Sequence, residues 1–176
     1  YKKELKIAKQ VSIKAGKFLK KEFNNWQRGQ DKYKKGHEIV TWCDKKSEKI
    51  IFKDLKKYFP KYNILSEETG QKNKKSNYTW IIDPLDGTAN FTIHNPLFSV
   101  SLALIYKKEI ILGVTYLPML NELYYANKGQ GAFKNNKKIK VSNINNLKRS
   151  FLTYCHGLKL SDIKKGPCRG PFFVLL

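Results

Sequence analysis

An apolar segment that runs directly into a cluster of acidic and turn-forming residues constrains the fold of this chain most. Residues 80–82 (Trp-Ile-Ile) lead into residues 83–91, with the sequence Asp-Pro-Leu-Asp-Gly-Thr-Ala-Asn-Phe. Apolar residues followed by turn formers indicate a buried strand whose end opens into a loop. Because Pro84 fixes its own φ and favours an extended Asp83, the strand is predicted to end there.

Two carboxylates project from this turn, since Asp83 and Asp86 are separated by only two residues. Without a cation between them their charges repel, and the pKa of one of them rises. Hard divalent cations such as Mg²⁺ prefer carboxylate and carbonyl oxygens and would remove the repulsion. The turn therefore predicts a magnesium site, with simple loop closure by an Asp-Pro-x-Asp-Gly run as the alternative interpretation.

Length and composition indicate a soluble protein with one sizeable core. A chain of 176 residues forms one domain, or a domain and part of another, and no apolar run is long enough to span a membrane. It begins at Tyr1 without a signal peptide. Cys43, Cys155 and Cys168 are scattered and lack Cys-x-x-Cys spacing, so we expect free thiols in a reducing compartment, the cytoplasm.

The net charge of +21 allows two interpretations. A basic surface can hold nucleic acid, or it can attract anionic substrates. Only three of the 35 basic residues are arginines, and the 32 lysines are spread along the whole chain. Nucleic-acid readers tend to use clustered arginines, so we expect no dedicated nucleic-acid partner, and a field that favours phosphorylated substrates.

Hydrophobic periodicity predicts an α+β fold in which two N-terminal helices pack on an antiparallel sheet. The helices are expected at residues 3–24 and 44–58, with Asp44 as the N-cap of the second. Residues 70–77 are predicted to be an exposed loop and residues 128–133 a glycine turn. The predicted strands share β-rich composition and lie at 40–41, 62–65, 80–82, 97–106, 109–117, 122–126, 138–141 and 151–157.

Three ordered motifs together resemble the inositol monophosphatase family of metal-dependent phosphatases. They are residues 39–44 (Ile-Val-Thr-Trp-Cys-Asp), 64–68 (Ile-Leu-Ser-Glu-Glu) and the acidic turn 83–91. The similarity extends from about Leu5 to about Gly157. It implies a layered α/β sandwich like those of inositol monophosphatase and fructose-1,6-bisphosphatase, of which the second half is missing here.

The resemblance also implies a set of metal ligands. Glu67, Asp83 and the backbone carbonyl of Leu85 would hold the first Mg²⁺, with Asp83 bridging to a second ion held by Asp86. Glu68 is expected to support Glu67 from behind. For two adjacent acids at a strand end, a solvated edge is the alternative interpretation.

Catalytic and substrate-binding residues follow from the same resemblance. Asp44 and Thr88 would orient and deprotonate the attacking water. The backbone N–H groups of Gly87 and Thr88, together with Asp86, would bind the substrate. The alternatives are that Thr88 only caps a helix and that Gly87 supplies only backbone freedom. Residues 34–36 (Lys-Lys-Gly) are weaker candidates.

The sequence departs from the family pattern near its C-terminal end. Residues 1–157 are predicted to form the N-terminal metal-binding domain, and residues 158–176 an atypical start of the second half. The final segment, 166–176, does not resemble the family, and the family's later Trp-Asp motif, with a further metal-binding Asp, is absent.

These observations favour an Mg²⁺-dependent phosphomonoesterase that hydrolyses inositol monophosphate to inositol and phosphate. A fructose-1,6-bisphosphatase is the enzymatic alternative, and a catalytically inactive fragment is the alternative from another class. The expected partner is a phosphorylated polyol or sugar, with a homodimer in the full-length form and no membrane association.

Overall fold

The computed structural model describes residues 1–27, 32–33, 39–72, 74–146, 149, 152–154 and 173–175. They belong to two units, Tyr1–Ile139 and Lys140–Leu176. The second unit contains an antiparallel pair, β11 (Leu152–Tyr154) with β12 (Phe173–Leu175), so the strand predicted at residues 151–157 is seen in part. The domain boundary predicted after residue 157 falls outside the described residues and stays a prediction.

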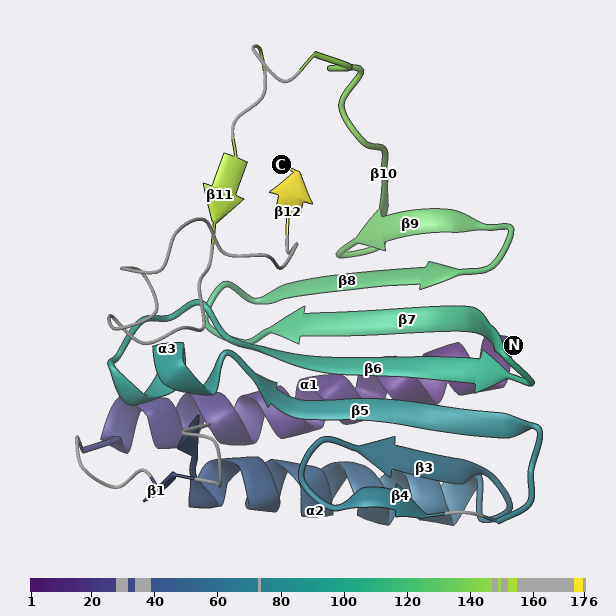
Figure 1. Cartoon of the computed structure of the whole chain (residues 1–176), viewed down its shortest axis with the longest axis horizontal. Coiled ribbons are helices and arrows are strands. Elements are labelled where there is room, and N and C mark those ends of the chain that lie inside the picture. The colour runs from purple at the N-terminus through teal and green to yellow at the C-terminus, as the bar shows by residue number, and fades with distance from the viewer. Residues whose placement is uncertain are drawn as a thin grey trace, which may run out of the picture. The chain divides into compact units, whose positions relative to one another are not determined.

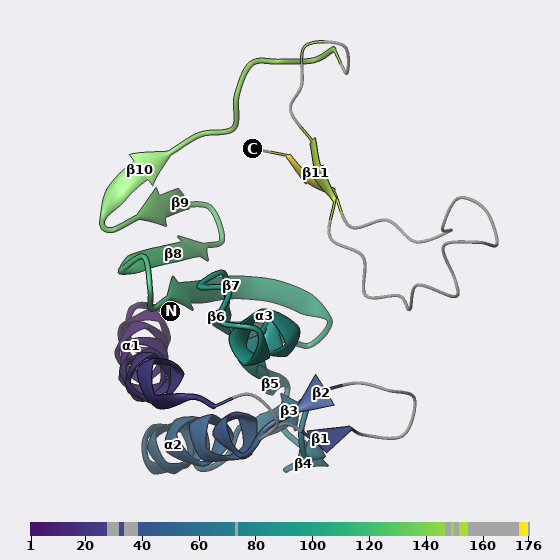
Figure 2. The same ribbon diagram turned by 90° about the vertical axis from the view of Figure 1, so that its left-hand side faces the viewer.

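Two amphipathic helices cover one face of the first unit (Figures 1 and 2). α1 (Lys2–Asn25) buries a stripe that includes Val11, Ala15 and Leu19, and most of its lysines are exposed. α2 (Trp42–Tyr58) buries Ile51 and Leu55. Both helices were predicted from apolar spacing, and both are confirmed. Within the described part of the chain, no helix combines the length and apolar character needed to span a membrane.

The helices pack on an eight-stranded sheet with the order β10-β9-β8-β7-β6-β5-β3-β4. Its strands are β3 (Asn63–Ser66), β4 (Gly70–Lys72), β5 (Tyr78–Asp86), β6 (Ser99–Tyr106), β7 (Glu109–Leu117), β8 (Glu122–Asn127), β9 (Gly131–Lys134) and β10 (Lys137–Ile139). β1 (Lys32–Tyr33) and β2 (Ile39–Val40) form a separate antiparallel pair. The helix-on-sheet layering is confirmed.

The sheet is mixed, because β3 and β5 run parallel while the other neighbours are antiparallel. The prediction of a purely antiparallel sheet was therefore wrong at this one pairing. Parallel neighbours place their carboxyl ends at the same edge of a sheet. Here the arrangement delivers the ends of β3 and β5, and with them the two acidic motifs, to one place (Figure 1).

The core lies between the helices and the sheet. Trp80 and Leu104 are fully buried there, on the neighbouring strands β5 and β6. α1 approaches β7 so closely that a Cβ added at Gly16 would lie 2.4 Å from the Cδ1 atom of Tyr116. The absence of a side chain at Gly16 therefore permits this helix–sheet contact.

β5 does not end at Asp83, as the sequence predicted, but continues through Pro84 to Asp86. The register of β5 against β6 shifts between Asp83 and Asp86. A proline lacks the backbone N–H that a regular ladder needs, and a bulge is one of the few places where a strand accepts it. The irregularity allows β5 to continue past Pro84, so that both Asp83 and Asp86 belong to the strand.

Two other segments expected to be irregular are partly strand. Gly70–Lys72, in the predicted exposed loop, forms β4 and pairs with β3. Gly131–Lys134, in the predicted glycine turn, forms β9 and pairs with β8. Apart from Phe133, both segments are made of residues with weak strand preference, and backbone hydrogen bonds to neighbouring strands hold them.

Cys43 is a buried free thiol in α2, and burial raises its pKa to about 12. A thiol with so high a pKa carries almost no thiolate and is unreactive. Cys43 is free in the described structure, as expected, whereas Cys155 and Cys168 lie outside the described residues.

Candidate active site

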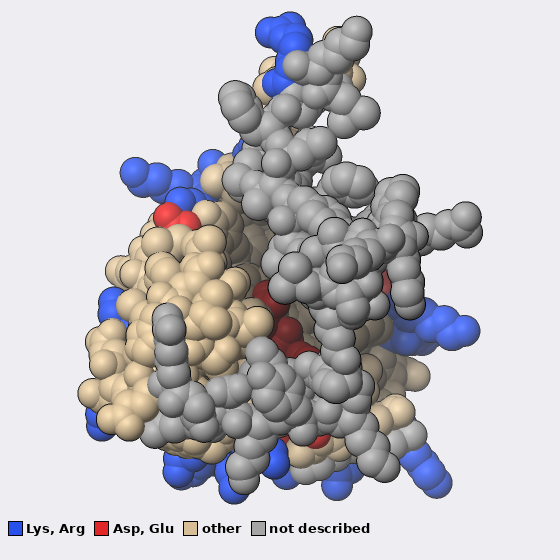
Figure 3. Space-filling view, turned by 60° about the vertical axis from the view of Figure 1, so that its left-hand side comes forward, with Lys and Arg blue, Asp and Glu red and all other residues tan. Residues whose placement is uncertain are grey.

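The candidate site forms where β3 and β5 end side by side. The Glu67 backbone N–H donates to the carbonyl oxygen of Ile82 at 3.2 Å, which brings Glu67 next to Asp83. The Leu85 N–H donates to Oδ1 of Asp83 at 3.2 Å, so the turn fixes the orientation of this carboxylate. Figure 3 shows Asp and Glu atoms recessed in a hollow on this side of the molecule, with Lys and Arg atoms toward the periphery.

Asp83 lies in an unfavourable environment for a negative charge. Its pKa is raised to about 8, first by burial, then by the charges of Glu67 and Asp86, and by a hydrogen bond with the Glu67 side chain. A carboxyl group whose pKa is raised in this way is stabilised by a proton or by a cation. The cause that the sequence predicted, repulsion between acids on the turn, is present, with burial as the larger contribution.

The donor set at Asp83 suits a hard divalent cation. The carboxylates of Glu67 and Asp83 contact each other, and the carbonyl of Leu85 adds a third oxygen on the same turn. This carbonyl accepts a hydrogen bond from the Thr88 hydroxyl at 3.0 Å and retains a second lone pair. Oxygen ligands of this kind fit Mg²⁺, so the residues predicted for the first metal are compatible with it.

Asp86 differs from the other two acids in its hydrogen-bond partner. Its side chain is exposed, and its Oδ2 accepts a hydrogen bond from the Ser99 hydroxyl at 3.0 Å. Among the described residues, no three His, Cys, Asp or Glu side chains converge closely enough to hold a metal ion. The structure thus joins Glu67 with Asp83, and the ligand role of Asp86 stays a prediction.

Asp44 and Thr88 form the second part of the site. The Thr88 hydroxyl donates to Oδ1 of Asp44 at 3.0 Å, the same distance as to the Leu85 carbonyl, so its single hydrogen serves one acceptor at a time. Asp44 is 2% exposed, and burial raises its pKa, although hydrogen bonds from Thr41 and Thr88 oppose the rise. The buried Asp44 carboxylate can therefore accept a proton from the Thr88 hydroxyl.

The structure corrects the capping role of Asp44. The N-cap of α2 is Thr41, and Asp44 occupies the third helical position of a capping box. Oδ2 of Asp44 accepts from the backbone N–H of Thr41 at 2.7 Å and from its hydroxyl at 2.6 Å. This reciprocal arrangement fixes the carboxylate on the helix and leaves Oδ1 for Thr88.

Gly87 occupies a position that other residues tolerate poorly. Its φ is +87°, and an added Cβ would lie 3.1 Å from the carbonyl oxygen of Leu97. Gly87 is also the N-cap of the five-residue helix α3 (Thr88–Thr92), which has no side-chain cap. Gly87 thus supplies backbone freedom here, whereas its predicted part in substrate binding stays a prediction, and the interpretation of Thr88 as the helix cap is wrong.

A cavity of about 500 Å³ opens on the face of the sheet beside Asp83. One row of paired residues crosses it, in which Asp83 pairs with Ser101, Ser101 with Thr115, and Thr115 with Tyr124. The hydroxyl oxygens of Ser101 and Thr115 are 3.2 Å apart. Hydroxyl-bearing side chains thus extend from the acidic cluster along the sheet.

Sequence reasoning missed several polar residues that support the site. Ser47, Glu48 and Ser99 hydrogen-bond to segments that carry the predicted ligands. The helical spacing of Ser47 and Glu48 from Asp44 was an available signal, because residues three and four apart share one helix face. Residues 34–36, the weaker candidates, lie outside the described part of the chain.

A family model for the inositol monophosphatase family matches residues 1–167. The chain belongs to this family. It is 38% identical over 153 residues to a fructose-1,6-bisphosphatase/inositol-1-monophosphatase of Aquifex aeolicus, covering 87% of this chain and 58% of that protein. It is 40% identical over 161 residues to an inositol monophosphatase of Dictyostelium discoideum, covering 90% of this chain and 59% of the relative.

A solved structure confirms the fold. The IMPase of Thermotoga maritima matches with a TM-score of 0.75 and 37% identity, covering 80% of this chain and 54% of that structure. The layered α/β sandwich expected from the motifs is therefore the fold of the family. The chain spans little more than half the length of the relatives that it matches.

Proposed function

We propose that this chain supplies the metal-binding half of an Mg²⁺-dependent phosphomonoesterase that hydrolyses inositol monophosphate. One observation carries the proposal: Asp83, which interacts with Glu67 at the end of β3, lies on the same segment as Thr88, whose hydroxyl is bonded to buried Asp44. A cation site next to a hydroxyl–carboxylate pair is the arrangement that hydrolysis of a phosphate ester by water requires.

Magnesium held by Glu67, Asp83 and the Leu85 carbonyl, with a second ion at Asp86, would supply charge neutralisation for the phosphoryl oxygens. Thr88 would accept a hydrogen bond from the attacking water. As the water oxygen bonds to phosphorus, its proton would pass to Oγ1 of Thr88 while the hydroxyl proton of Thr88 passes to Oδ1 of Asp44. The bond between phosphorus and the polyol oxygen breaks, and this oxygen would take a proton from a solvent water and leave as the polyol hydroxyl.

Asp44 suits the role of final proton acceptor. It lies 3.0 Å from the Thr88 hydroxyl, and its burial raises its pKa, which increases its affinity for a proton. The backbone N–H groups at Gly87 and Thr88 would bind the phosphate, because α3 has no side-chain cap that would occupy the first N–H groups of the helix. Asp86, exposed next to them, would contact the substrate.

Fructose-1,6-bisphosphatase activity is the second candidate function. The Aquifex relative is named for both activities, and that protein is 38% identical to this chain. Both reactions cleave a phosphomonoester with the same requirements at phosphorus. The polyol or sugar is therefore the part of the substrate on which the two candidates differ.

The test is a comparison of the 176-residue chain with a full-length version of the protein. We expect Mg²⁺-dependent release of phosphate from inositol 1-phosphate by the full-length version, and little or none by the short chain. Fructose 1,6-bisphosphate, assayed in parallel, decides between the two substrates. The absence of Mg²⁺-dependent hydrolysis of either by the full-length version would overturn the proposal, and equal specific activity of both chains would refute the need for a second half.

The remaining expectations are part of the same proposal. A homodimer of the full-length form is tested by light scattering. A reducing, cytoplasmic location is supported by the buried, reduced Cys43. A nucleic-acid partner is tested by salt dependence, because phosphate-backbone binding weakens steeply with salt, whereas the proposed hydrolysis depends on Mg²⁺.

A further inference from the structure

The N-terminal part of α2 carries three buried polar residues on one face. Asp44, Ser47 and Glu48 are only 2%, 0% and 4% exposed. Their spacing of three and four residues places them on the same side of the helix. A buried polar group destabilises the fold unless it is hydrogen-bonded. The hydrogen-bond partners of these side chains therefore identify the segments that this face of α2 positions.

Ser47 forms a hydrogen bond to the acidic turn of β5. Its hydroxyl donates to the carbonyl oxygen of Pro84 at 2.7 Å, between positions 37 residues apart in the sequence. Pro84 lies between Asp83 and Leu85, within the irregular part of β5. A fixed carbonyl at Pro84 restricts the rotation of the peptide unit that leads into Leu85, whose own carbonyl is a proposed ligand.

Glu48 forms a hydrogen bond to the segment that follows Glu67. Its Oε1 accepts a hydrogen bond from the Thr69 hydroxyl at 2.9 Å. Thr69 lies two residues after Glu67, at the end of the turn between β3 and β4. Since Asp44 binds Thr88, one face of α2 contacts all three segments that contribute to the site.

We propose that Ser47 and Glu48 are positioning residues for the cation site, and that they hold the Asp83–Leu85 turn and the Glu67–Thr69 segment in register. The inference rests on the proposed function and deepens it. Both contacts lie behind the proposed ligands and touch neither substrate nor cation. Loss of such supporting contacts typically costs a factor of about 10 to 100 in metal affinity or activity.

The first test uses Thr69 in the full-length protein, because this residue is exposed and its replacement spares the core. Thr69→Val keeps the shape and removes the hydroxyl, whereas Thr69→Ser keeps the hydroxyl. We expect Thr69→Val to weaken Mg²⁺ binding about tenfold in isothermal titration calorimetry, and Thr69→Ser to restore it. The kcat at saturating Mg²⁺ should change much less than the Mg²⁺ concentration that gives half-maximal rate.

The second test asks whether Thr69 acts through Glu48. In a double-mutant cycle, Glu48→Ala and Thr69→Val should each weaken Mg²⁺ binding, and the double variant should lose little more than Glu48→Ala alone. Ser47→Ala should weaken Mg²⁺ binding independently. Lys49→Ala, at an exposed position on the same helix, is the matched control and should leave Mg²⁺ binding unchanged.

The outcomes separate this inference from the proposed function. Unchanged Mg²⁺ affinity in both Thr69→Val and Ser47→Ala, in a wild-type protein that does hydrolyse the ester, would overturn the inference alone. A lower Tm without metal, together with unchanged affinity, would also overturn it, since it would show a purely structural role. A wild-type protein without Mg²⁺-dependent activity would count against the proposed function instead.

Discussion

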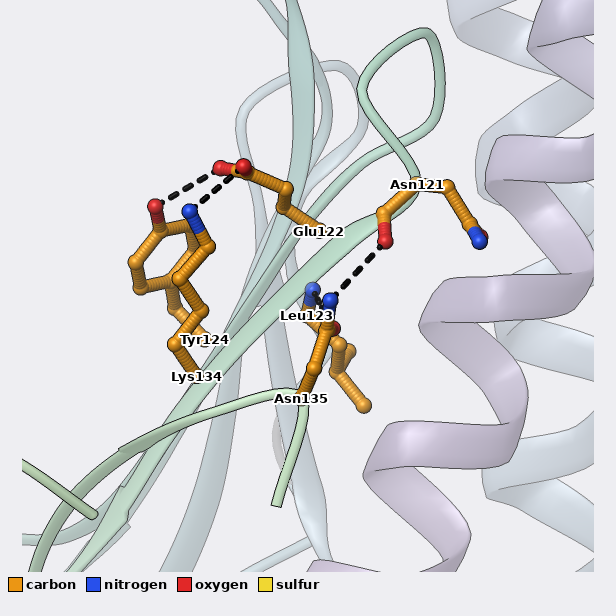
Figure 4. A network of polar contacts seen from close by, with 6 residues as sticks. All are labelled: Asn121, Glu122, Leu123, Tyr124, Lys134 and Asn135. Carbon is orange, nitrogen blue, oxygen red and sulfur yellow. Dashed lines mark hydrogen bonds and ion pairs between the residues drawn. The ribbon is translucent and has the colours of Figure 1, made fainter. Parts of the chain in front are cut away.

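At the turn between β7 and β8, Glu122 is neutralised by a lysine, whereas at the end of β5 Asp83 lies among other acids. Glu122 accepts a hydrogen bond from the Tyr124 hydroxyl at 2.7 Å and pairs with Nζ of Lys134 at 2.5 Å (Figure 4). The hydrogen bonds from Lys134 and then Tyr124 hold the pKa of Glu122 below its usual value. The pKa of Asp83 is raised instead.

The backbone next to Glu122 is likewise fixed by hydrogen bonds within the chain. Asn135 donates to the carbonyl of Asn121 at 3.2 Å and accepts from the N–H of Leu123 at 2.8 Å (Figure 4). The side chains of Glu122, Tyr124, Lys134 and Asn135 all find partners within the chain. It is a structural cluster, which stabilises a turn and the adjacent strand.

The contrast shows where this chain leaves a charge unbalanced. With 32 lysines available, a cation could accompany any acid, as it does at Glu122. The groups that act most strongly on the charge of Asp83 are Glu67 and Asp86. A cluster of uncompensated acids in so basic a protein destabilises the fold unless a ligand supplies the missing charge, which is typical of a functional site.

The largest expected effect is at Asp83 itself. In the full-length protein, Asp83→Asn should reduce hydrolysis to background, because the proposed bridging ligand loses its negative charge. The same change should raise the Tm of the metal-free protein, because it removes repulsion from Glu67 and Asp86. Phosphate release and thermal unfolding measure the two effects. Near-normal turnover at ordinary Mg²⁺ concentrations would show that the centre is wrongly assigned.

Thr88→Ala should lower kcat by about 10² to 10⁴ and change KM little, because the hydroxyl is proposed to act on the water during the reaction. Steady-state kinetics at saturating Mg²⁺ measure both constants. A change confined to KM would make Thr88 a binding residue. Thr88→Ser, which keeps the hydroxyl, is the matched control and should retain most of the activity.

The pH dependence of stability should reveal the unbalanced charge. Asp83 has a pKa of about 8 in the folded chain against 3.8 as its ordinary value, so between these pH values the folded state binds the extra proton. The free energy of unfolding of the metal-free protein should therefore fall as pH rises from about 4 to 8. Urea titrations at several pH values test this, and Asp83→Asn should flatten the slope.

Glu122→Gln should have the smallest effect. It removes the charge that pairs with Lys134, but an exposed ion pair contributes little to stability. We expect a slightly lower Tm and unchanged Mg²⁺ dependence of turnover. Loss of Mg²⁺ binding in this variant would break the distinction between a structural and a functional acid cluster.

Sequence reasoning succeeded where a local pattern determines the outcome. The apolar spacing of α1 and α2 and the β-rich runs of β6 and β7 marked these elements close to their observed bounds. The acidic turn could be located for the same reason, because the residues that define it are consecutive in the sequence. Repulsion at Asp83 followed directly from two carboxylates on one short turn.

The failures concern features that depend on distant partners. β4 has a weak strand signal of its own, and it exists because the edge of β3 offers hydrogen bonds. Ser47 and Glu48 resemble members of a solvated helix face, and only the Pro84 carbonyl and Thr69 explain their burial. Asp44 was assigned to the wrong capping position because Thr41, three residues earlier, is an equally good cap by composition.

The parallel pairing of β3 with β5 has a consequence for how the protein folds. Residues 66 and 82 become neighbours only when β3 and β5 pair, and the intervening chain forms β4 on the other side of β3. An unfolded or partly folded chain therefore presents Glu67 and Asp83 as separate acids with little affinity for a divalent ion. An ion that binds the completed sheet at the proposed site, and not its precursors, would make its concentration a control on how much of the chain is folded.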